Sequence, residues 1–384
     1  MYKRSELITV ISFCLIIAIL SVLFVVLPDK EFSEQENRNL EQAPELNNDT
    51  FFSGEFAKDT NVYYSDQFPF RNLFVKIKSF SELSLLKGEN NGVLYSEEQL
   101  AVKDFNAYQS IINIVEDTDR IFLDSAEAQL KAIDTLGKNL EIPLVTVIPP
   151  RTIDIADSKF SYDRPDGDKI FEIMQNTLGE DTGYIDTLGI LRPKYEQGEY
   201  VYYRTDHHWT TQSAYYIYCE IMKQLGRADN IIPKSEFETE VIEDFSGTTA
   251  ARANFPIYKK DTLEIWHLDD DDQYTVIADD ENIGGFYNRS YLEKSDKYSV
   301  FLDGTHGVTT IKKNGAERDT LLIAKDSFAN CLIPFLAREF DIVALNLADS
   351  SFITAYAETY QADAVLLVYN TENLITTGEL GKLK

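Results

Sequence analysis

The sequence predicts an α/β fold in which helices flank a parallel β-sheet. Apolar runs of strand length occur at 142–148, 321–324, 342–345 and 364–368. Amphipathic segments with helical spacing separate the last three runs, and another precedes the first. Strands that alternate with helices are typical of a parallel sheet, because parallel neighbours need long crossover connections. A β-rich insertion over residues 228–300 and one N-terminal transmembrane helix complete the prediction.

The first element is an apolar segment. Residues 7–27 carry no charge, and at about 1.5 Å per helical residue they can cross a hydrocarbon core of about 30 Å. Lys3 and Arg4 precede this segment and acidic residues follow it, so the positive-inside rule places residues 1–6 in the cytoplasm. A cleaved signal peptide is the alternative, but its apolar region is normally shorter, about 7–15 residues. We therefore expect a single-pass anchor in the cell membrane with the main domain outside the cytoplasm.

An extracytoplasmic stalk with lead-in helices is expected over residues 28–95. Residues 31–48 are polar, and residues 51–87 carry apolar side chains at spacings of three to four, interrupted by the sequence FPFR. The α/β domain is expected to fill residues 96–384. This lead-in pattern indicates ordinary helix packing.

Composition excludes several classes of protein. The net charge of -28, from 64 acidic and 36 basic residues, repels nucleic acid and anionic head groups. Three cysteines, one of them in the apolar N-terminal segment, cannot build a disulfide framework or a thiolate metal site. Cys219 and Cys331 could pair, but we expect free thiols, and we expect no cofactor.

Polar chemistry concentrates at residues 205–210, which read TDHHWT. Two of the four histidines of the chain adjoin here, and a helical pattern over 214–225 follows. In an extended segment Asp206 and His208 share a face, so the carboxylate can fix the imidazole tautomer, while His207 points the other way. A helix-capping cluster with packed rings is the alternative. A metal site is disfavoured because neighbouring histidines face apart.

A candidate nucleophile lies 119 residues beyond His208. The apolar run 321–324, a turn and Ser327 precede a second helical pattern, and a strand–turn–serine–helix sequence exposes a serine oxygen. Backbone N–H groups at such a helix start can hold an oxyanion. Pro334 requires either a kinked helix or a short turn before a helix that starts at Pro334. The alternative interpretation is that Ser327 belongs to an ordinary helix cap.

These two motifs carry a resemblance. TDHHWT at 205–210 and KDSFAN at 325–330 resemble the DHHW family of envelope proteins, which is similar to the SGNH-hydrolase-like domains of alginate O-acetylation. ENR at 36–38, DQFPFR at 66–71 and PPR at 149–151 fit those families as well. The resemblance implies an SGNH-hydrolase-like sheet in which Asp206 orients the base His208 and Ser327 is the nucleophile.

Substrate-binding residues are less clearly indicated. Arg151, Asn330, Tyr203 and Trp209 are the candidates, with Asn330 or Asn370 for the oxyanion hole; plain cap, turn or surface roles are the alternatives for Arg151 and the two asparagines. The family's Asp-Leu-Arg-Tyr run is expected near 346–351, where this chain reads NLADSS and lacks the arginine. The glycine-containing segment 303–307 resembles a family loop and is equally compatible with a β-turn.

Three functions remain open. The favoured one is transfer of an acetyl group through Ser327 to a hydroxyl of an exported or cell-wall polysaccharide. The second is an acetyl esterase with the same residues, and the third is a non-catalytic envelope protein that binds glycan or organises an assembly. Because acetyl-coenzyme A is cytoplasmic, an outer transferase needs a partner, and we expect a multi-spanning membrane acyltransferase that delivers the acetyl group.

Overall fold

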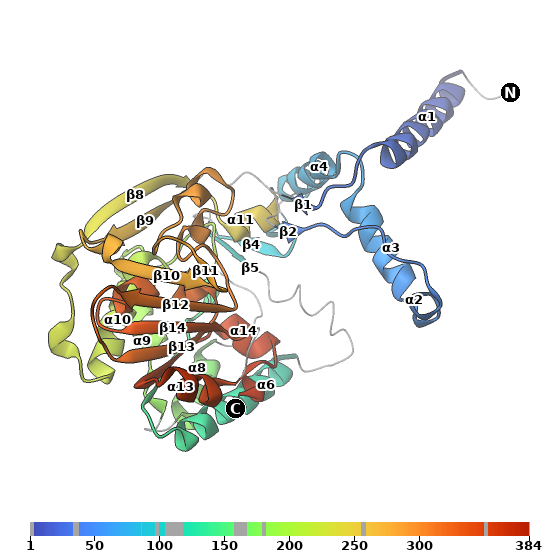
Figure 1. Cartoon of the computed structure of the whole chain (residues 1–384). Helices are drawn as coiled ribbons and strands as arrows, with labels where there is room; N and C mark the ends of the chain where they lie inside the picture. The colour runs from blue at the N-terminus through green and yellow to red at the C-terminus, as the bar shows by residue number, and fades with distance from the viewer. Residues whose placement is uncertain are drawn as a thin grey trace. The chain divides into compact units, whose positions relative to one another are not determined.

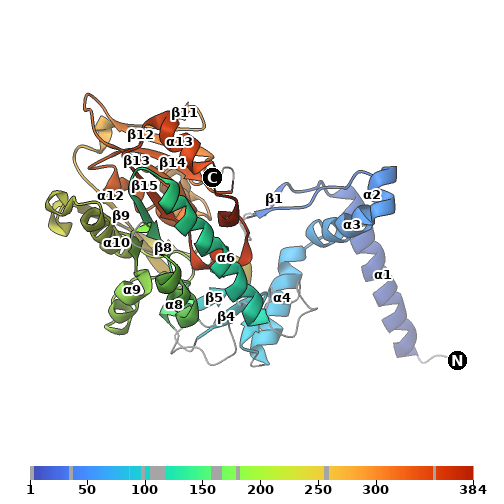
Figure 2. The ribbon, with the colours of Figure 1, turned by 90° about the horizontal axis from the view of Figure 1, so that it is seen from below.

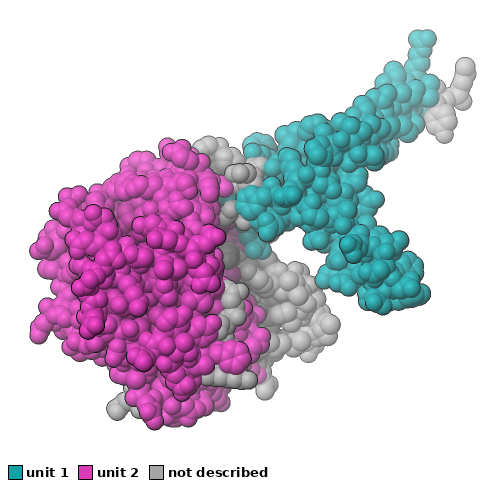
Figure 3. Space-filling view, viewed as in Figure 1, with its two compact units in different colours: residues 1–91, 251–256 teal, residues 92–250, 257–384 magenta. Residues whose placement is uncertain are grey.

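The computed structural model describes residues 4–33, 38–85, 87–96, 100–103, 118–156, 167–178, 182–254, 259–348 and 352–383. It divides into two compact units (Figure 3). Unit 1 contains residues 1–91 and 251–256, and unit 2 contains residues 92–250 and 257–384. Two residues of the ENR motif, Glu36 and Asn37, lie outside the described residues, as do residues 349–351.

Unit 1 is mainly helical. Its elements are α1 (Arg4–Val26), β1 (Phe32–Ser33), β2 (Arg38–Asn39), α2 (Asn48–Ser53), α3 (Glu55–Asp66), α4 (Arg71–Ser84) and β3 (Glu89–Asn90). An 18-residue stretch of helix α1 has a mean hydropathy of 3.0, and the helix is long and apolar enough to cross a membrane. Gly54, with φ of 81°, separates α2 from α3 in a left-handed conformation that suits glycine. The lead-in region is therefore helical, as predicted.

The centre of unit 2 is an eight-stranded sheet (Figures 1 and 2). Its order is β11 (Glu281–Asn282), β10 (Tyr274–Ala278), β12 (Val308–Lys313), β14 (Asp341–Asn346), β13 (Thr320–Lys325), β15 (Ala364–Val368), β6 (Leu144–Val147) and β7 (Tyr184–Ile185). The five strands from β14 to β7 are parallel. The four apolar runs of the sequence form β6, β13, β14 and β15, so the α/β prediction is confirmed.

The other edge of the sheet is antiparallel, which the sequence did not indicate. Strands β12, β10 and β11 pair antiparallel with their neighbours, so the sheet is mixed. Within residues 228–300, β8 (Glu238–Phe245) and β9 (Asp261–His267) form a separate two-stranded sheet, whereas β10 and β11 extend the main sheet. Alternate residues of β10 are buried, which is the pattern of a strand with one face on the core.

Helices pack around this sheet. They are α6 (Thr118–Asn139), α7 (Thr152–Ile155), α8 (Gly167–Thr177), α9 (Thr187–Glu196), α10 (Thr211–Gln224), α11 (Thr248–Ala253), α12 (Ile333–Leu336), α13 (Ile353–Tyr360) and α14 (Thr371–Thr376). Helix α6 packs against α8 and α14, and α10 packs against α12 and β9. A small antiparallel pair, β4 (Val93–Tyr95) and β5 (Ala101–Lys103), completes the unit.

The parallel strands end at a common edge. The chain leaves β13 at Lys325, β15 at Val368 and β6 at Val147. Open α/β sheets bind ligands beyond the carboxyl ends of their strands. Ser327, Asn370 and Arg151 follow these three ends within two to four residues, so the topology brings them to one edge.

Candidate active site

The segment with Asp206 and His208 forms a tight loop before a helix. An isolated antiparallel bridge joins Tyr202 to Trp209, and the chain between them bends. Helix α10 starts directly afterwards, and the side chain of Thr210 caps it by accepting a hydrogen bond from the Ser213 N–H. The predicted position of the motif, in the loop before a helix, is confirmed.

Ser327 lies just beyond the end of central strand β13. Asp326 is extended, and a 3₁₀ turn spans Ser327–Ala329. The Asp326 carboxylate accepts the Phe328 N–H at 2.9 Å, so that N–H is already engaged. Helix α12 then begins at Ile333 with Pro334 in its first turn, which matches the second of the two arrangements considered for Pro334.

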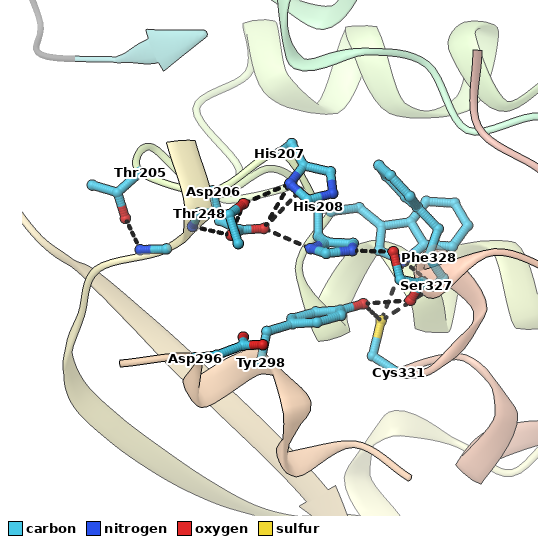
Figure 4. Close-up of polar contacts among 12 residues, drawn as sticks. Thr205, Asp206, His207, His208, Thr248, Asp296, Tyr298, Ser327, Phe328 and Cys331 are labelled. Carbon is cyan, nitrogen blue, oxygen red and sulfur yellow. Dashed lines mark hydrogen bonds and ion pairs between the residues drawn. The ribbon is translucent and has the colours of Figure 1, made fainter. Parts of the chain in front are cut away.

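Asp206, His208 and Ser327 form one chain of hydrogen bonds (Figure 4). His208 Nδ1 lies 2.6 Å from Asp206 Oδ1, and His208 Nε2 lies 2.8 Å from Ser327 Oγ. Asp206 and His208 are buried, whereas Ser327 is partly exposed. A serine, an imidazole and a carboxylate in this order can move a proton away from the serine oxygen.

The second oxygen of Asp206 is held by Thr248. Asp206 Oδ2 accepts the Thr248 N–H at 2.7 Å and the Thr248 hydroxyl at 2.9 Å. Burial by itself raises the pKa of Asp206, but the charges of His208 and His207 and the hydrogen bonds from His208 outweigh burial and hold the pKa well below its usual range. Asp206 is therefore a carboxylate over the whole physiological pH range.

Gly247 leaves room for this carboxylate. A Cβ atom on Gly247 would lie 2.3 Å from Asp206 Cβ and Oδ2, a distance that real contacts do not show. Glycine is required here because a side chain would not fit. Its backbone conformation is not the reason, since Gly247 is not among the glycines with positive φ. Sequence reasoning missed Gly247 and Thr248. They lie 41 and 42 residues beyond Asp206, and no local pattern connects the two segments.

His207 does not point away from His208 as predicted. The two ring centroids are 3.9 Å apart, and His207 Nδ1 lies 2.7 Å from Thr248 Oγ1. The prediction assumed an extended segment, but residues 204–208 bend, so side chains do not alternate. Because the single Thr248 hydroxyl proton goes to Asp206, His207 Nδ1 must donate its own proton to Thr248.

This arrangement also changes the argument about a metal. Ligand atoms of Asp206, His207 and His208 all lie within 4.8 Å of one another, so the two histidines do not face apart. However, Asp206 Oδ1 and His208 Nδ1 are only 2.6 Å apart. Two atoms bound to one tetrahedral zinc at about 2.0 Å would be about 3.3 Å apart. The separation fits a hydrogen bond better than a shared ion.

Tyr298 packs against one face of the His208 ring. It comes from a 3₁₀ turn at Lys297–Val300, and its ring stacks on the His208 ring with centroids 3.8 Å apart and planes 8° from parallel. Its hydroxyl donates to Cys331 Sγ at 3.3 Å. Burial raises the pKa of the Cys331 thiol to about 11, so this sulfur is protonated and inert at neutral pH. Cys219 and Cys331 are free, as expected.

Tyr203 and Trp209 lie inside the core. Their exposed fractions are 1% and 0%. Trp209 Nε1 donates to the Phe328 carbonyl at 3.0 Å, and the Tyr203 ring packs edge-on against Tyr298. They hold the two halves of the site together and have no surface to offer a substrate. The expectation that they bind substrate directly is wrong for this conformation, because aromatic residues beside a motif are as often structural as functional.

Asn330 is structural as well. It is 1% exposed, its Nδ2 donates to the Gly304 carbonyl at 2.8 Å, and its Oδ1 accepts from Lys325 Nζ at 2.7 Å. Both ends of the amide have partners and the side chain is enclosed, so it presents no surface to an oxyanion. Burial lowers the pKa of Lys325 to about 8, although Asp326 opposes the shift.

A small hollow with a free volume of about 30 Å³ opens at this edge of the sheet. Among its lining residues are Pro150, Arg151, His207, Phe328, Asn370 and Glu372. The Arg151 guanidinium binds Asp154 through two hydrogen bonds, at 2.8 Å from Nε and 2.5 Å from Nη2. Asn370 donates its N–H to Asp326 at 2.7 Å. Arg151 and Asn370 therefore both lie at the hollow, where the sequence suggested substrate contacts.

Comparison with known families identifies the chain. The family model described as DHHW protein matches residues 87–346, which is more than half of the chain. The chain belongs to the DHHW family. The matched region contains Asp206, His208 and Ser327, and the predicted resemblance is confirmed. No curated protein matches the chain.

Two solved structures, a DHHW family protein and PatB1, share the fold of this DHHW protein. A DHHW family protein from Eubacterium siraeum has a TM-score of 0.58 and 18% identity over 77% of this chain and 95% of its own. Bacillus cereus PatB1, solved with a sulfonyl adduct, has a TM-score of 0.61 and 18% identity over 76% of this chain and 100% of its own. The O-acetyltransferase domain of Pseudomonas putida AlgJ scores 0.44 at 12% identity, covering 76% of this chain and 95% of its own.

Proposed function

We propose that this DHHW protein is a membrane-anchored O-acetyltransferase that acts outside the cytoplasm on an exported or cell-wall polysaccharide. The observation that carries the proposal is the unbroken chain of hydrogen bonds from Asp206 through His208 to a partly exposed Ser327. A serine nucleophile is activated by a base that an orienting carboxylate holds, in this order. Asp206 also accepts the backbone N–H groups of His208 and Thr248, as a capping residue would, but capping does not account for the contact of His208 Nε2 with Ser327 Oγ.

The reaction has two transfers. His208 Nε2 takes the proton of Ser327 as its Oγ attacks the acetyl carbonyl, and the proton passes to the departing oxygen of the donor as acetyl-Ser327 forms. A sugar hydroxyl then gives its proton to His208 and attacks the acetyl group. Collapse of the intermediate returns this proton to Ser327 Oγ and leaves the acetylated sugar. The ionised Asp206 stabilises the imidazolium during both transfers.

One of the solved structures that share the fold, PatB1, carries a sulfonyl adduct. The sulfonyl adduct in PatB1 belongs to that protein. Sulfonyl reagents modify activated hydroxyl groups, so the same class of reagent is a suitable probe for Ser327.

Helix α1 is proposed as the anchor, with its N-terminus in the cytoplasm. The mean hydropathy of 3.0 and the absence of buried residues in α1 fit a helix surrounded by lipid. The acetyl group must then cross the membrane, and a multi-spanning acyltransferase is the proposed partner that supplies it.

The test uses the full chain in detergent with an aryl acetate ester and a sulfonyl fluoride. Wild type should release acetate and acquire one sulfonyl group, whereas Ser327→Ala should do neither. Ser290→Ala is the control, because Ser290 is an exposed serine in another 3₁₀ turn. Absence of labelling and turnover in wild type would leave the non-catalytic function. Acetate release to water without transfer to any added polysaccharide would favour the esterase.

A further inference from the structure

Helix α4 presents its apolar face outward. At about 100° per residue, the side chains of one face fall within an arc of about 120°. The apolar face consists of five side chains, from the N-cap residue Phe70 onward, and all are exposed, from 46% for Phe74 to 66% for Phe80. They are Phe70, Leu73, Phe74, Ile77 and Phe80. Ser79 lies on the opposite face and is the one buried residue among those described in α4. This orientation is the reverse of that of an ordinary surface helix.

The inward face of α4 is held by polar contacts. Ser79 Oγ donates to the Val75 carbonyl at 2.8 Å and accepts from Asn91 Nδ2 at 3.3 Å. Lys78 Nζ donates to Asn91 Oδ1 at 3.0 Å. Asn91 Nδ2 also donates to the Ala253 carbonyl. These contacts fix the rotation of the helix, so its outward apolar face is built into unit 1.

The chain just before α4 is hydrogen-bonded to the chain just after α1. Gln67 Nε2 donates to the Lys30 carbonyl at 2.9 Å, and Gln67 Oε1 accepts the Lys30 N–H at 3.0 Å. Phe24, in the last turns of α1, packs on Tyr63 and Tyr64 of α3 with centroids 5.7 and 4.9 Å apart. These contacts, all within unit 1, join the chain four residues before α4 to the chain four residues after α1.

We infer that the outward face of α4 lies in the interface of the outer leaflet and forms a second membrane contact beside α1. Continuity with α1 argues for lipid as the occupant, because a bilayer that surrounds α1 begins beside Lys30. Phenylalanine-rich amphipathic helices bind at this depth, with cations extending to head groups. Lys76 is exposed and flanks the apolar face.

The inference rests on the proposed anchoring of α1 in the membrane. It is tested by the quenching of tryptophan fluorescence in lipid vesicles. The two native tryptophans, Trp209 and Trp266, are buried, so a new tryptophan reports its own surroundings. Full-length Phe74→Trp and Val241→Trp are reconstituted into phosphatidylcholine vesicles with brominated acyl chains; Val241 is 49% exposed on β8 and lies outside the proposed contact. We expect Phe74→Trp to be quenched by bromine severalfold more than Val241→Trp, and by iodide severalfold less.

Two results would overturn the inference. Equal iodide quenching at both positions would show that α4 faces water. Protection of Phe74→Trp from both quenchers would show that protein, either a second copy or another part of this chain, covers the face. Ile16→Trp in α1 is a separate control. If bromine fails to quench it, the anchor proposal is wrong, and that failure is distinguishable from a failure at α4.

Discussion

The ring of Tyr298 lies flat against one face of the ring of His208, with centroids 3.8 Å apart, whereas the hydrogen bonds to Asp206 and Ser327 are made at the edge of the ring. The two nitrogens of His208 are therefore fixed in the ring plane by Asp206 and Ser327, and tilting is prevented by Tyr298. An aromatic face also favours a positive charge above it. Tyr298 is thus a positioning residue for the imidazolium that the proposed reaction forms.

The first prediction separates the Tyr298 ring from its hydroxyl. Tyr298→Phe keeps the stack and loses the contact with Cys331, so ester turnover should fall less than about fivefold, the worth of one neutral hydrogen bond. Tyr298→Leu loses the stack and should lower kcat by about tenfold or more, with KM little changed. Steady-state kinetics on an aryl acetate measures both. Equal loss in the two variants would mean that the stack does not matter.

The second prediction compares the two histidines. His208→Ala removes the group between Asp206 and Ser327, so acetate release should fall by about 10⁴-fold or more. His207→Ala leaves that chain intact and removes one hydrogen bond to Thr248, so the loss should stay within about tenfold. Thermal unfolding of both variants shows whether folding is retained. A larger loss of acetate release in His207→Ala than in His208→Ala would show that His208 is not the base.

The third prediction concerns the space beside Asp206. Gly247→Ala places a methyl group where the carboxylate lies, so unfolding free energy should drop by about 1–3 kcal/mol and turnover by about 100-fold. Gly285→Ala is the matched control, because a Cβ there meets nothing within 4 Å. Denaturant unfolding and ester turnover measure the pair. Wild-type behaviour of Gly247→Ala would show that Asp206 is free to move.

The fourth prediction follows from the buried Lys325. Its pKa falls from 10.5 to about 8 on folding, so between these values the unfolded chain binds the extra proton and stability rises with pH. Below pH 8 the buried charge costs up to about 3 kcal/mol, partly offset by its hydrogen bond to Asn330. Lys325→Met should therefore be the more stable protein at pH 7.

The measurement for Lys325 is the difference in unfolding free energy between Lys325→Met and wild type from pH 7 to pH 10. Taking the difference removes the titration of other groups. The advantage of Lys325→Met should shrink steadily above pH 8. A difference that does not change with pH would show that Lys325 is neutral throughout or not buried as described.

The sequence alone was sufficient to predict the parallel strands of the sheet and the candidate site. The apolar runs that became β6, β13, β14 and β15 are buried on both faces, and such strands read as continuous apolar segments wherever they occur. Residues 205–210 and Ser327 were recognisable because polar residues gather there beside predicted elements. The antiparallel edge was not recognisable, because short alternating strands such as β10 carry no information about which partner they will join.

What the sequence by itself determined about this protein is the α/β alternation, the apolar helix α1 and the choice of Asp206, His208 and Ser327 as the candidate catalytic set. Only the tertiary structure decided that Gly247, Thr248 and Tyr298 surround that set, that His207 lies beside His208, and that Tyr203, Trp209 and Asn330 are enclosed. The physical reason is the separation along the sequence between the residues that are in contact. Periodicity records how each residue meets its own helix or strand, whereas these contacts join segments dozens of residues apart and arise when packing brings them together and buried polar groups take partners.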